Sequence, residues 1–231
     1  MPPPIFTSFD EAWRWFSGGG ELMTLEEQRA RFTEGRAQFL SFQVRVTDAA
    51  AVDLALDIQD AVDHVDGVER FPDDLLHISV LGVGFQVIEA RRPNDVLRQD
   101  VASIAERAAK ALCGAKPVHV TLGPVNLFPD ALILEVHDDG ALKEIRRSLE
   151  AETRPDAFGF EETSFLPHTT IATFTDASAA DGLREALPPL RDRAAVPMRI
   201  DRIELTRWWM TGVDLTEPPE ADVLRSYALR G

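Results

Sequence analysis

The sequence predicts an α+β fold built from two similar halves, and three observations support this prediction. Strand-like and helix-like segments are mixed along the 231 residues without strict alternation. The order strand, helix, strand, helix occurs twice, and in each copy the second strand contains a histidine followed two residues later by a hydroxyl side chain. His77 lies 38 residues beyond Phe39, and His168 lies 37 residues beyond Ala131. The two histidines therefore occupy equivalent places in an internal duplication.

Residues 1–38 precede the first half and are predicted to form a helical appendage. This segment has a proline-rich start, a tryptophan-bearing stretch "FDEAWRWF", a run of three glycines and a helix-like stretch "MTLEEQRARFTEGRAQ". Thr24 followed by Glu27 is typical of a capping box at a helix start. We therefore divide the chain into an N-terminal helical appendage, residues 1–38, and a main bilobal domain, residues 39–231.

The elements of the main domain follow from composition and periodicity. In the first half we expect a strand at 39–46, a helix at 49–62, a strand at 75–84 that runs into a glycine turn, and a long helix at 94–112. In the second half we expect strands at 118–128 and 131–138 joined by a Phe128-Pro129-Asp130 turn, a helix at 140–152, a strand at 165–174, a helix at 179–190 and one long strand at 198–209.

The two histidine strands share a side-chain pattern. Successive side chains of a strand alternate between its faces. His77 and Ser79 in "LLHISVLGVG" therefore share one face, as do His168 and Thr170 in "FLPHTTIATF", while their apolar neighbours point to the other face. Either pair alone would suit a half-buried strand histidine hydrogen-bonded locally to a hydroxyl. Recurrence at equivalent places favours a functional interpretation of both pairs.

The other histidines lack this support. His119 also precedes a hydroxyl by two residues, but the duplication provides no equivalent histidine in the first half, so we expect it on an edge or a solvated face of a strand. His64 and His137 have no hydroxyl side chain at this spacing. Trp208 and Trp209 are adjacent in the last long strand, so they point to opposite faces and one of them can reach a groove.

Composition narrows the classes of partner. The chain carries 24 basic and 39 acidic residues, a net charge of −15. This balance opposes binding to long duplex nucleic acid, whose affinity comes largely from phosphate neutralisation. It leaves room for a small anionic ligand in a local basic pocket.

Cellular context is predicted from cysteine usage and the absence of targeting patterns. A single cysteine, Cys113, excludes an intramolecular disulfide framework and a multi-cysteine metal site, so a reducing cytoplasm is the expected location. The N-terminal stretch has no basic region followed by an apolar one, and no apolar run approaches the roughly 18 residues of a membrane span. We expect no membrane partner.

Two histidine-hydroxyl pairs facing each other across a groove would suit phosphodiester chemistry. One neutral imidazole can deprotonate an attacking water while the other, protonated, donates to the leaving oxygen. Ser79 and Thr170 would donate hydrogen bonds to the non-bridging phosphate oxygens. This chemistry needs neither a metal nor a cofactor. A metal hydrolase with the two histidines as ligands is an alternative, but no third ligand accompanies them at a suitable spacing.

The motifs "HISV" and "HTTI", one per half, with "LFPDALILEV" between them, resemble the 2H phosphoesterase superfamily, also called the 2′-5′ RNA ligase-like family, over residues 39–210. The resemblance implies a two-lobed, pseudo-twofold α+β fold with helices outside and a central groove between antiparallel sheets. It implies catalytic roles for His77 and His168, with Ser79 and Thr170 as substrate-binding partners. The implied reaction is metal-independent opening of a cyclic phosphodiester, often a ribose 2′,3′-cyclic phosphate, on a small nucleotide or an RNA end.

Several alternatives stay open at this level. Some members of the family join RNA ends through a 2′-5′ linkage, and others cleave 2′-5′ oligoadenylates. A non-catalytic module that binds nucleotides or RNA ends in the same groove belongs to a different class of function. The sequence does not specify which histidine is the acid, which phosphate isomer is produced, the role of residues 1–38 or the oligomeric state.

Overall fold

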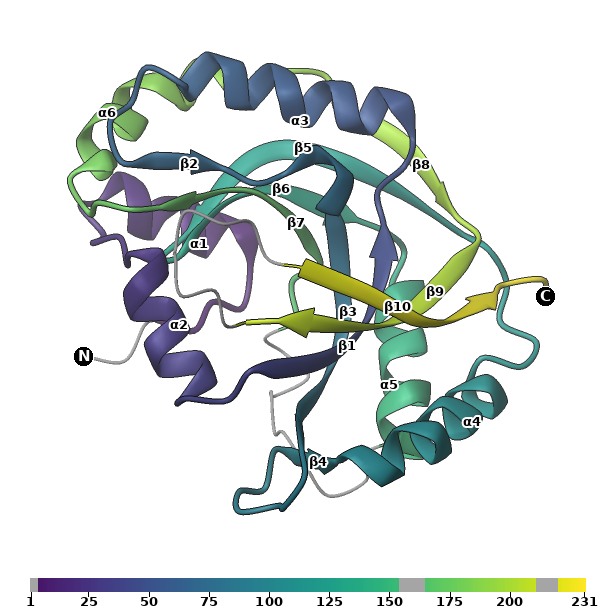
Figure 1. Cartoon of the computed structure of the whole chain (residues 1–231). Coiled ribbons are helices and arrows are strands. Elements are labelled where there is room, and N and C mark those ends of the chain that lie inside the picture. Colours follow the sequence, from purple (N-terminus) through teal and green to yellow (C-terminus); the bar gives the residue numbers. More distant parts are fainter. Residues whose placement is uncertain (1–3, 154–164, 211–219) are drawn as a thin grey trace.

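The computed structural model describes residues 4–153, 165–210 and 220–231 (Figure 1). In these residues ten strands form one curled sheet with the order β10-β9-β1-β3-β7-β6-β5-β8, while β2 pairs with β7 and β4 pairs with β3. The strands are β1 (Gln38–Arg45), β2 (Val68–Arg70), β3 (His77–Val87), β4 (Asp95–Leu97), β5 (Val118–Phe128), β6 (Ala131–His137), β7 (His168–Phe174), β8 (Val196–Ile200), β9 (Arg202–Trp209) and β10 (Glu220–Ala228).

The sheet confirms the predicted α+β fold and its two equivalent halves. The two histidine strands, β3 and β7, are central neighbours and run antiparallel. β1 flanks β3 on one side and β6 flanks β7 on the other, so the two strands chosen as equivalent from the sequence occupy equivalent places. β3 and β7 meet at the single residue pair Ile78 and Thr169, which joins the two half-sheets into one. All strand pairs are antiparallel except that of β3 with β4.

The helices lie around the outside of the sheet (Figure 1). Equivalent helices connect equivalent strands: α3 links β1 to the first histidine strand, and α5 links β6 to the second. α4 packs against α5, and α6 packs against α3. The helices are α1 (Phe9–Ser17), α2 (Leu25–Thr33), α3 (Ala49–Val62), α4 (Val101–Ala111), α5 (Ala141–Thr153) and α6 (Ala179–Ala186).

Local signals in the sequence account for the start of α2. The Thr24 hydroxyl accepts the Glu27 backbone N–H, and the Glu27 carboxylate accepts the Thr24 backbone N–H, so the expected capping box is present. The helix ends earlier than expected because Glu34 adopts a left-handed conformation, with φ of 46°, and Gly35 follows at 84°. This reversal lets the chain enter β1 at Gln38.

The helix expected at 94–112 begins only at Val101, which corrects the prediction. Residues 95–97 instead form β4, which pairs in parallel with the end of β3. The Asp95 carboxylate accepts the backbone N–H groups of Arg91 and Arg92 and pairs with the Arg36 guanidinium. These long-range contacts hold the segment extended despite its helix-like composition.

The long strand expected at 198–209 is in fact two strands separated by Asp201. β8 pairs with β5 at one side of the sheet, whereas β9 pairs with β1 and β10 in the other half. The chain therefore crosses from one half to the other at Asp201, whose carbonyl accepts the Leu229 N–H. Each half gains an outer strand in this way.

Smaller differences concern element ends. The helix expected at 179–190 ends at Ala186 and is followed by a 3₁₀ turn at Pro188–Leu190. The histidine strands expected at 75–84 and 165–174 begin at the histidines themselves. The part of the C-terminal stretch at 211–219 lies outside the described residues, and β10 follows it.

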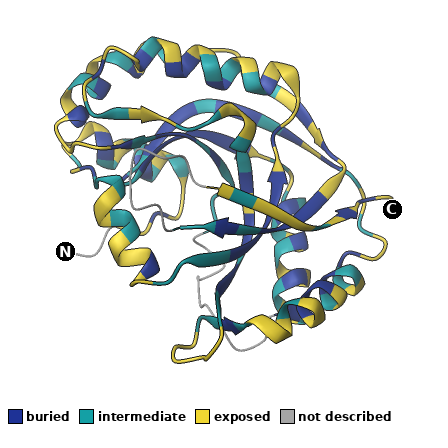
Figure 2. Cartoon of the chain, viewed as in Figure 1, coloured by how far each residue is buried: buried dark blue, intermediate teal, exposed yellow. Residues whose placement is uncertain are grey.

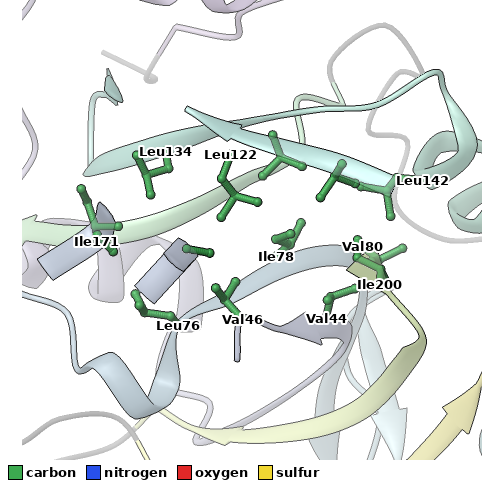
Figure 3. Close-up of a cluster of buried hydrophobic side chains, with 14 of the residues drawn as sticks. Val44, Val46, Leu76, Ile78, Val80, Leu122, Leu134, Leu142, Ile171 and Ile200 are labelled. Carbon is green, nitrogen blue, oxygen red and sulfur yellow. The ribbon is translucent and has the colours of Figure 1, made fainter. Parts of the chain in front are cut away.

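The hydrophobic core takes the apolar faces of strands from both halves. Figure 3 shows Ile78 and Val80 of β3 gathered with Leu122, Leu134 and Ile171 of the second half. These five side chains are almost completely buried. In Figure 2 the central strands are mostly dark blue, whereas the outer helix faces and β10 carry most of the exposed positions. No helix in the described parts of the chain is long and apolar enough to span a membrane.

Candidate active site

The face of β3 and β7 opposite the core carries the four residues predicted from the sequence. On β3, His77 is half-buried and Ser79 is exposed, while Ile78 between them is buried. On β7, His168 and Thr170 are half-buried while Thr169 between them is fully buried. Strand alternation therefore separates core-facing from site-facing side chains, as expected.

His77, Ser79 and Thr170 line one cavity of about 580 Å³. His168 lies beside this cavity, and its charge acts directly on the His77 ring. A volume of this size is within the roughly 300–1,000 Å³ range of small-molecule sites. The fold thus brings together both histidines and both hydroxyls from strands that are 91 positions apart in the sequence.

Both histidine rings are held by a hydrogen bond to the backbone carbonyl of the residue two positions earlier. His77 Nδ1 lies 2.9 Å from the Leu75 carbonyl oxygen, and His168 Nδ1 lies 2.7 Å from that of Leu166. A carbonyl only accepts hydrogen bonds, so Nδ1 is the protonated nitrogen in each ring. Nε2 is left in both rings as the nitrogen that can accept or release a proton during a reaction.

The surroundings of His77 are apolar. Its ring centroid lies 4.6 Å from that of Trp208 and 6.0 Å from that of Phe71. The pKa of His77 is lowered from the ordinary 6.5 to about 4, chiefly because burial disfavours the charged ring. The bond to Leu75 opposes this shift, and the neighbouring charge of His168 adds to it. His77 is therefore neutral at physiological pH and can act as a base.

The surroundings of His168 include a negative charge. Its ring meets Phe128 edge-on at 4.9 Å between centroids. The pKa of His168 is also lowered, chiefly because burial disfavours the charged ring, while the hydrogen bond to Leu166 and the carboxylate of Asp130 oppose this shift. No carboxylate is among the groups that shift the pKa of His77. The two rings therefore share a backbone frame but differ in how easily they hold a second proton.

Helix α2 of the N-terminal segment, at the left of Figure 1, forms one wall of the cavity. Its start is bonded to the β5–β6 turn, because Met23 N–H donates to the Pro129 carbonyl and the Gln28 amide donates to Asp130 at 2.7 Å. The cavity-lining residues from this segment are Met23, Leu25, Gln28, Arg29, Arg31 and Phe32.

The end of α2 is anchored in the other half. Phe32 contacts Phe39 and Phe85, with ring centroids 4.7 and 5.1 Å apart. Arg36, just after the helix, donates to Asn94 and Asp95. The helix thus bridges the two halves beside the histidine pair. The segment predicted as an appendage, which could cover the groove or mediate self-association, contributes residues to the cavity wall.

Sequence reasoning missed several cavity residues besides the predicted histidine and hydroxyls. One of Trp208 and Trp209 was expected to be able to reach a groove, and Trp208 is the one that lines the cavity beside His77. Its indole N–H donates to Ser41 and Gln43, both buried. Thr173 was missed because a bulge in β7 shifts the alternation after Thr170, a change that no local motif indicates. Asp130 was seen only as part of a turn.

The remaining histidines are not in the candidate site. His119 is exposed on β5, opposite Arg199 of β8, so the solvated position expected for it is confirmed. His137 pairs with Glu135 at 2.9 Å and contacts Phe9 of α1, and His64 lines a different, polar hollow near α6. Within the described residues, no three His, Cys, Asp or Glu side chains are grouped in a way that could hold a metal ion.

The chain is similar to known proteins in both sequence and fold. A family model described as "2'-5' RNA ligase superfamily" matches residues 30–209. The structure of TT0787 from Thermus thermophilus is similar with a TM-score of 0.57 at 18% identity, covering 84% of this chain and 98% of that one. Escherichia coli LigT complexed with NADP+ gives 0.58 at 12% identity, covering 85% and 100%. A crystal structure titled phosphoesterase gives 0.60 at 13% identity, covering 84% and 99%. A search of curated proteins found no match.

Proposed function

This chain belongs to the 2′-5′ RNA ligase superfamily, and we propose that it is a metal-independent phosphodiesterase that opens a 2′,3′-cyclic phosphate on a small nucleotide or an RNA end. One observation carries the proposal. Two histidines have the same fixed tautomer and a hydroxyl two residues later; His77 and both hydroxyls line one cavity of nucleotide size, and His168 is close enough for its charge to act on His77. General acid–base cleavage of a phosphodiester requires such a pair of imidazoles and donors for the phosphate oxygens.

The roles of the two histidines follow from their surroundings. His77, with a pKa of about 4, is neutral and acts as the base that takes a proton from the attacking water through Nε2. His168, beside Asp130, is the ring better suited to carry a proton and acts as the acid. The bond from water oxygen to phosphorus forms while the bond from phosphorus to one ribose oxygen breaks, and His168 protonates that oxygen.

Hydroxyl groups on the same strands hold the phosphate. Ser79 and Thr170 line the cavity with His77, where they can donate to the non-bridging oxygens whose charge grows in the transition state. No step in this scheme requires a metal ion.

A nucleotide-sized substrate is favoured over long RNA for two reasons. The net charge of −15 repels a long polyanion, whereas a local site can still hold one nucleotide. The cavity wall is mainly apolar and aromatic, with Phe39, Phe71 and Trp208 available to contact a base. The similar LigT structures include complexes with phosphate and with 3'-AMP.

The test is incubation with 2′,3′-cyclic nucleotides of all four bases, with and without EDTA, followed by ³¹P NMR. We expect opening to one phosphomonoester isomer at a rate that EDTA does not change. Loss of activity in EDTA would contradict the metal-independent mechanism. Tight binding without turnover would instead indicate a non-catalytic module that recognises nucleotides or RNA ends. Cleavage of 2′-5′ oligoadenylates, or joining of RNA ends, without opening of cyclic nucleotides would favour the alternative activities of the family.

A further inference from the structure

Arg29 is a half-buried cation on the α2 wall of the cavity. It lines the same space as His77, Ser79 and Thr170, but it comes from the N-terminal helix rather than from the histidine strands. α2 is held at both ends, through Gln28 on Asp130 and Phe32 on Phe85, so the helix that carries Arg29 is fixed relative to the histidine strands. This cation therefore belongs to a rigid part of the site.

No hydrogen bond or ion pair connects Arg29 to any other residue in the described parts of the chain. Of the other half-buried arginines that the structure describes, only Arg107 of α4 also lacks such a partner, and it does not line this cavity. The rest have partners. Arg36 pairs with Asp95, Arg191 pairs with Glu135 and donates to the Val125 carbonyl, and Arg184 donates to two backbone carbonyls. Burial without a partner lowers the pKa of Arg29, which shows that this position is costly for a cation.

An anionic ligand would explain this cost. The chain has 39 acidic residues, yet none of those described pairs with Arg29. Guanidinium groups match phosphate in geometry and bind it through paired hydrogen bonds. The reacting phosphate has its own donors on β3 and β7, so Arg29 is available for a different phosphate on the same ligand.

We propose that Arg29 binds a second phosphate, carried on the 5′ oxygen of the nucleotide whose cyclic phosphate reacts at the histidine pair. This inference rests on the proposed function. The second phosphate has two sources with the same chemistry: a terminal 5′-monophosphate, or the phosphodiester that continues into a short RNA. The apolar wall of the same cavity, which includes Phe39 and Trp208, would contact the nucleoside.

The experiment compares three substrates with the same reacting nucleotide: the 2′,3′-cyclic phosphate with a free 5′-hydroxyl, the same compound with a 5′-phosphate, and a dinucleotide that ends in the cyclic phosphate. The wild type should have a KM about tenfold lower for the substrates with a phosphate on the 5′ oxygen, as expected for one charge-assisted contact. In Arg29→Gln the ratio of KM values should fall to about 1. The matched control Arg98→Gln removes one positive charge from an exposed site outside the cavity and should keep the wild-type ratio.

The outcomes separate the inference from the function on which it rests. Equal KM values in the wild type, or an unchanged ratio in Arg29→Gln, would overturn the second-phosphate site. A gain for the 5′-monophosphate alone would identify a mononucleotide substrate, and an equal gain for the dinucleotide would identify an RNA end. If no substrate is turned over, the proposed reaction fails, and calorimetry with a nucleoside 3′-phosphate and a nucleoside 3′,5′-bisphosphate then decides. Tighter binding of the bisphosphate that is lost in Arg29→Gln supports the site, and equal binding overturns it.

Discussion

The two halves of the molecule carry the same histidine motif in different surroundings. In both, a strand begins at the histidine, and Nδ1 donates to the carbonyl two residues earlier. Around that shared frame, the first half places Trp208 and Phe71 against His77, whereas the second half places Phe128 and Asp130 near His168. The duplication thus supplies two equivalent imidazoles, and the proposed mechanism assigns them the roles of base and acid from the residues that surround each one.

The largest expected effect comes from removing either ring. His77→Ala and His168→Ala should each lower turnover of a cyclic nucleotide by about two to four orders of magnitude, because each removes a proton-transfer group. Steady-state kinetics with circular dichroism of the folded variants checks this. The control is His119→Ala. His119 is also followed by a threonine two residues later, but it is exposed outside the candidate site, so this variant should keep wild-type kinetics. Wild-type rates in either of the first two variants would remove that histidine from the mechanism.

Stability at acid pH provides a second way to separate the halves. The folded-state pKa of His77 is about 4 and its ordinary value is 6.5, so the folded protein binds fewer protons than the unfolded chain between these values. Stability is therefore lost as the pH falls from about 6.5 to 4. The contribution of this ring is about 3.5 kcal/mol at most, since one pKa unit is worth about 1.4 kcal/mol.

Urea unfolding of the wild type and His77→Gln at a series of pH values isolates the contribution of His77 to the free energy of unfolding. The variant should have a flatter stability profile across that window, and carboxylates common to both proteins cancel in the difference. Parallel profiles for the two proteins would show that His77 is not held neutral by its surroundings.

The indole beside His77 gives a smaller effect. Trp208→Phe keeps an aromatic ring but removes the N–H that serves buried Ser41 and Gln43. We expect a loss of about 1–2 kcal/mol in the free energy of unfolding. Trp209→Phe is the matched control, because its indole donates to exposed Asp222 and its loss should cost under about 0.5 kcal/mol. Equal losses in the two variants would argue against a specific role of the Trp208 hydrogen bonds.

The smallest effect is a shift in the pH profile. Asp130→Asn keeps an acceptor for Gln28 but removes the charge that raises the pKa of His168. The alkaline limb of kcat/KM should move to lower pH, because the acid loses its proton sooner, while the acid limb set by His77 stays in place. Asp139→Asn, at an exposed position beyond β6, should leave both limbs unchanged. A shift of the acid limb in Asp130→Asn would reverse the assignment of base and acid.

The parts of the site that could be predicted from the sequence depend on the alternation of side chains along a strand and on the internal duplication. Strand alternation places His77 with Ser79 and His168 with Thr170, and the equal spacing in the two halves identifies both pairs without coordinates. The capping box at Thr24 was also predictable, because its bonds join residues three apart.

The remaining features depend on contacts between distant segments. Arg29 and Asp130 reach the cavity only because α2 bonds to the β5–β6 turn, 102 positions away in the sequence. The break at Asp201 follows from pairing with different halves of the sheet, and nothing in the composition of 198–209 marks it. Tertiary pairing likewise overrides the helix-like composition of residues 94–100.

The most direct test of the account is a pH titration of the histidine ring nitrogens by two-dimensional ¹H–¹⁵N NMR. We expect both rings to be protonated on Nδ1 when neutral, and His77 to titrate near pH 4, below His168. A pKa of His77 at or above that of His168 would contradict the claim that the two halves make unlike partners of a duplicated pair.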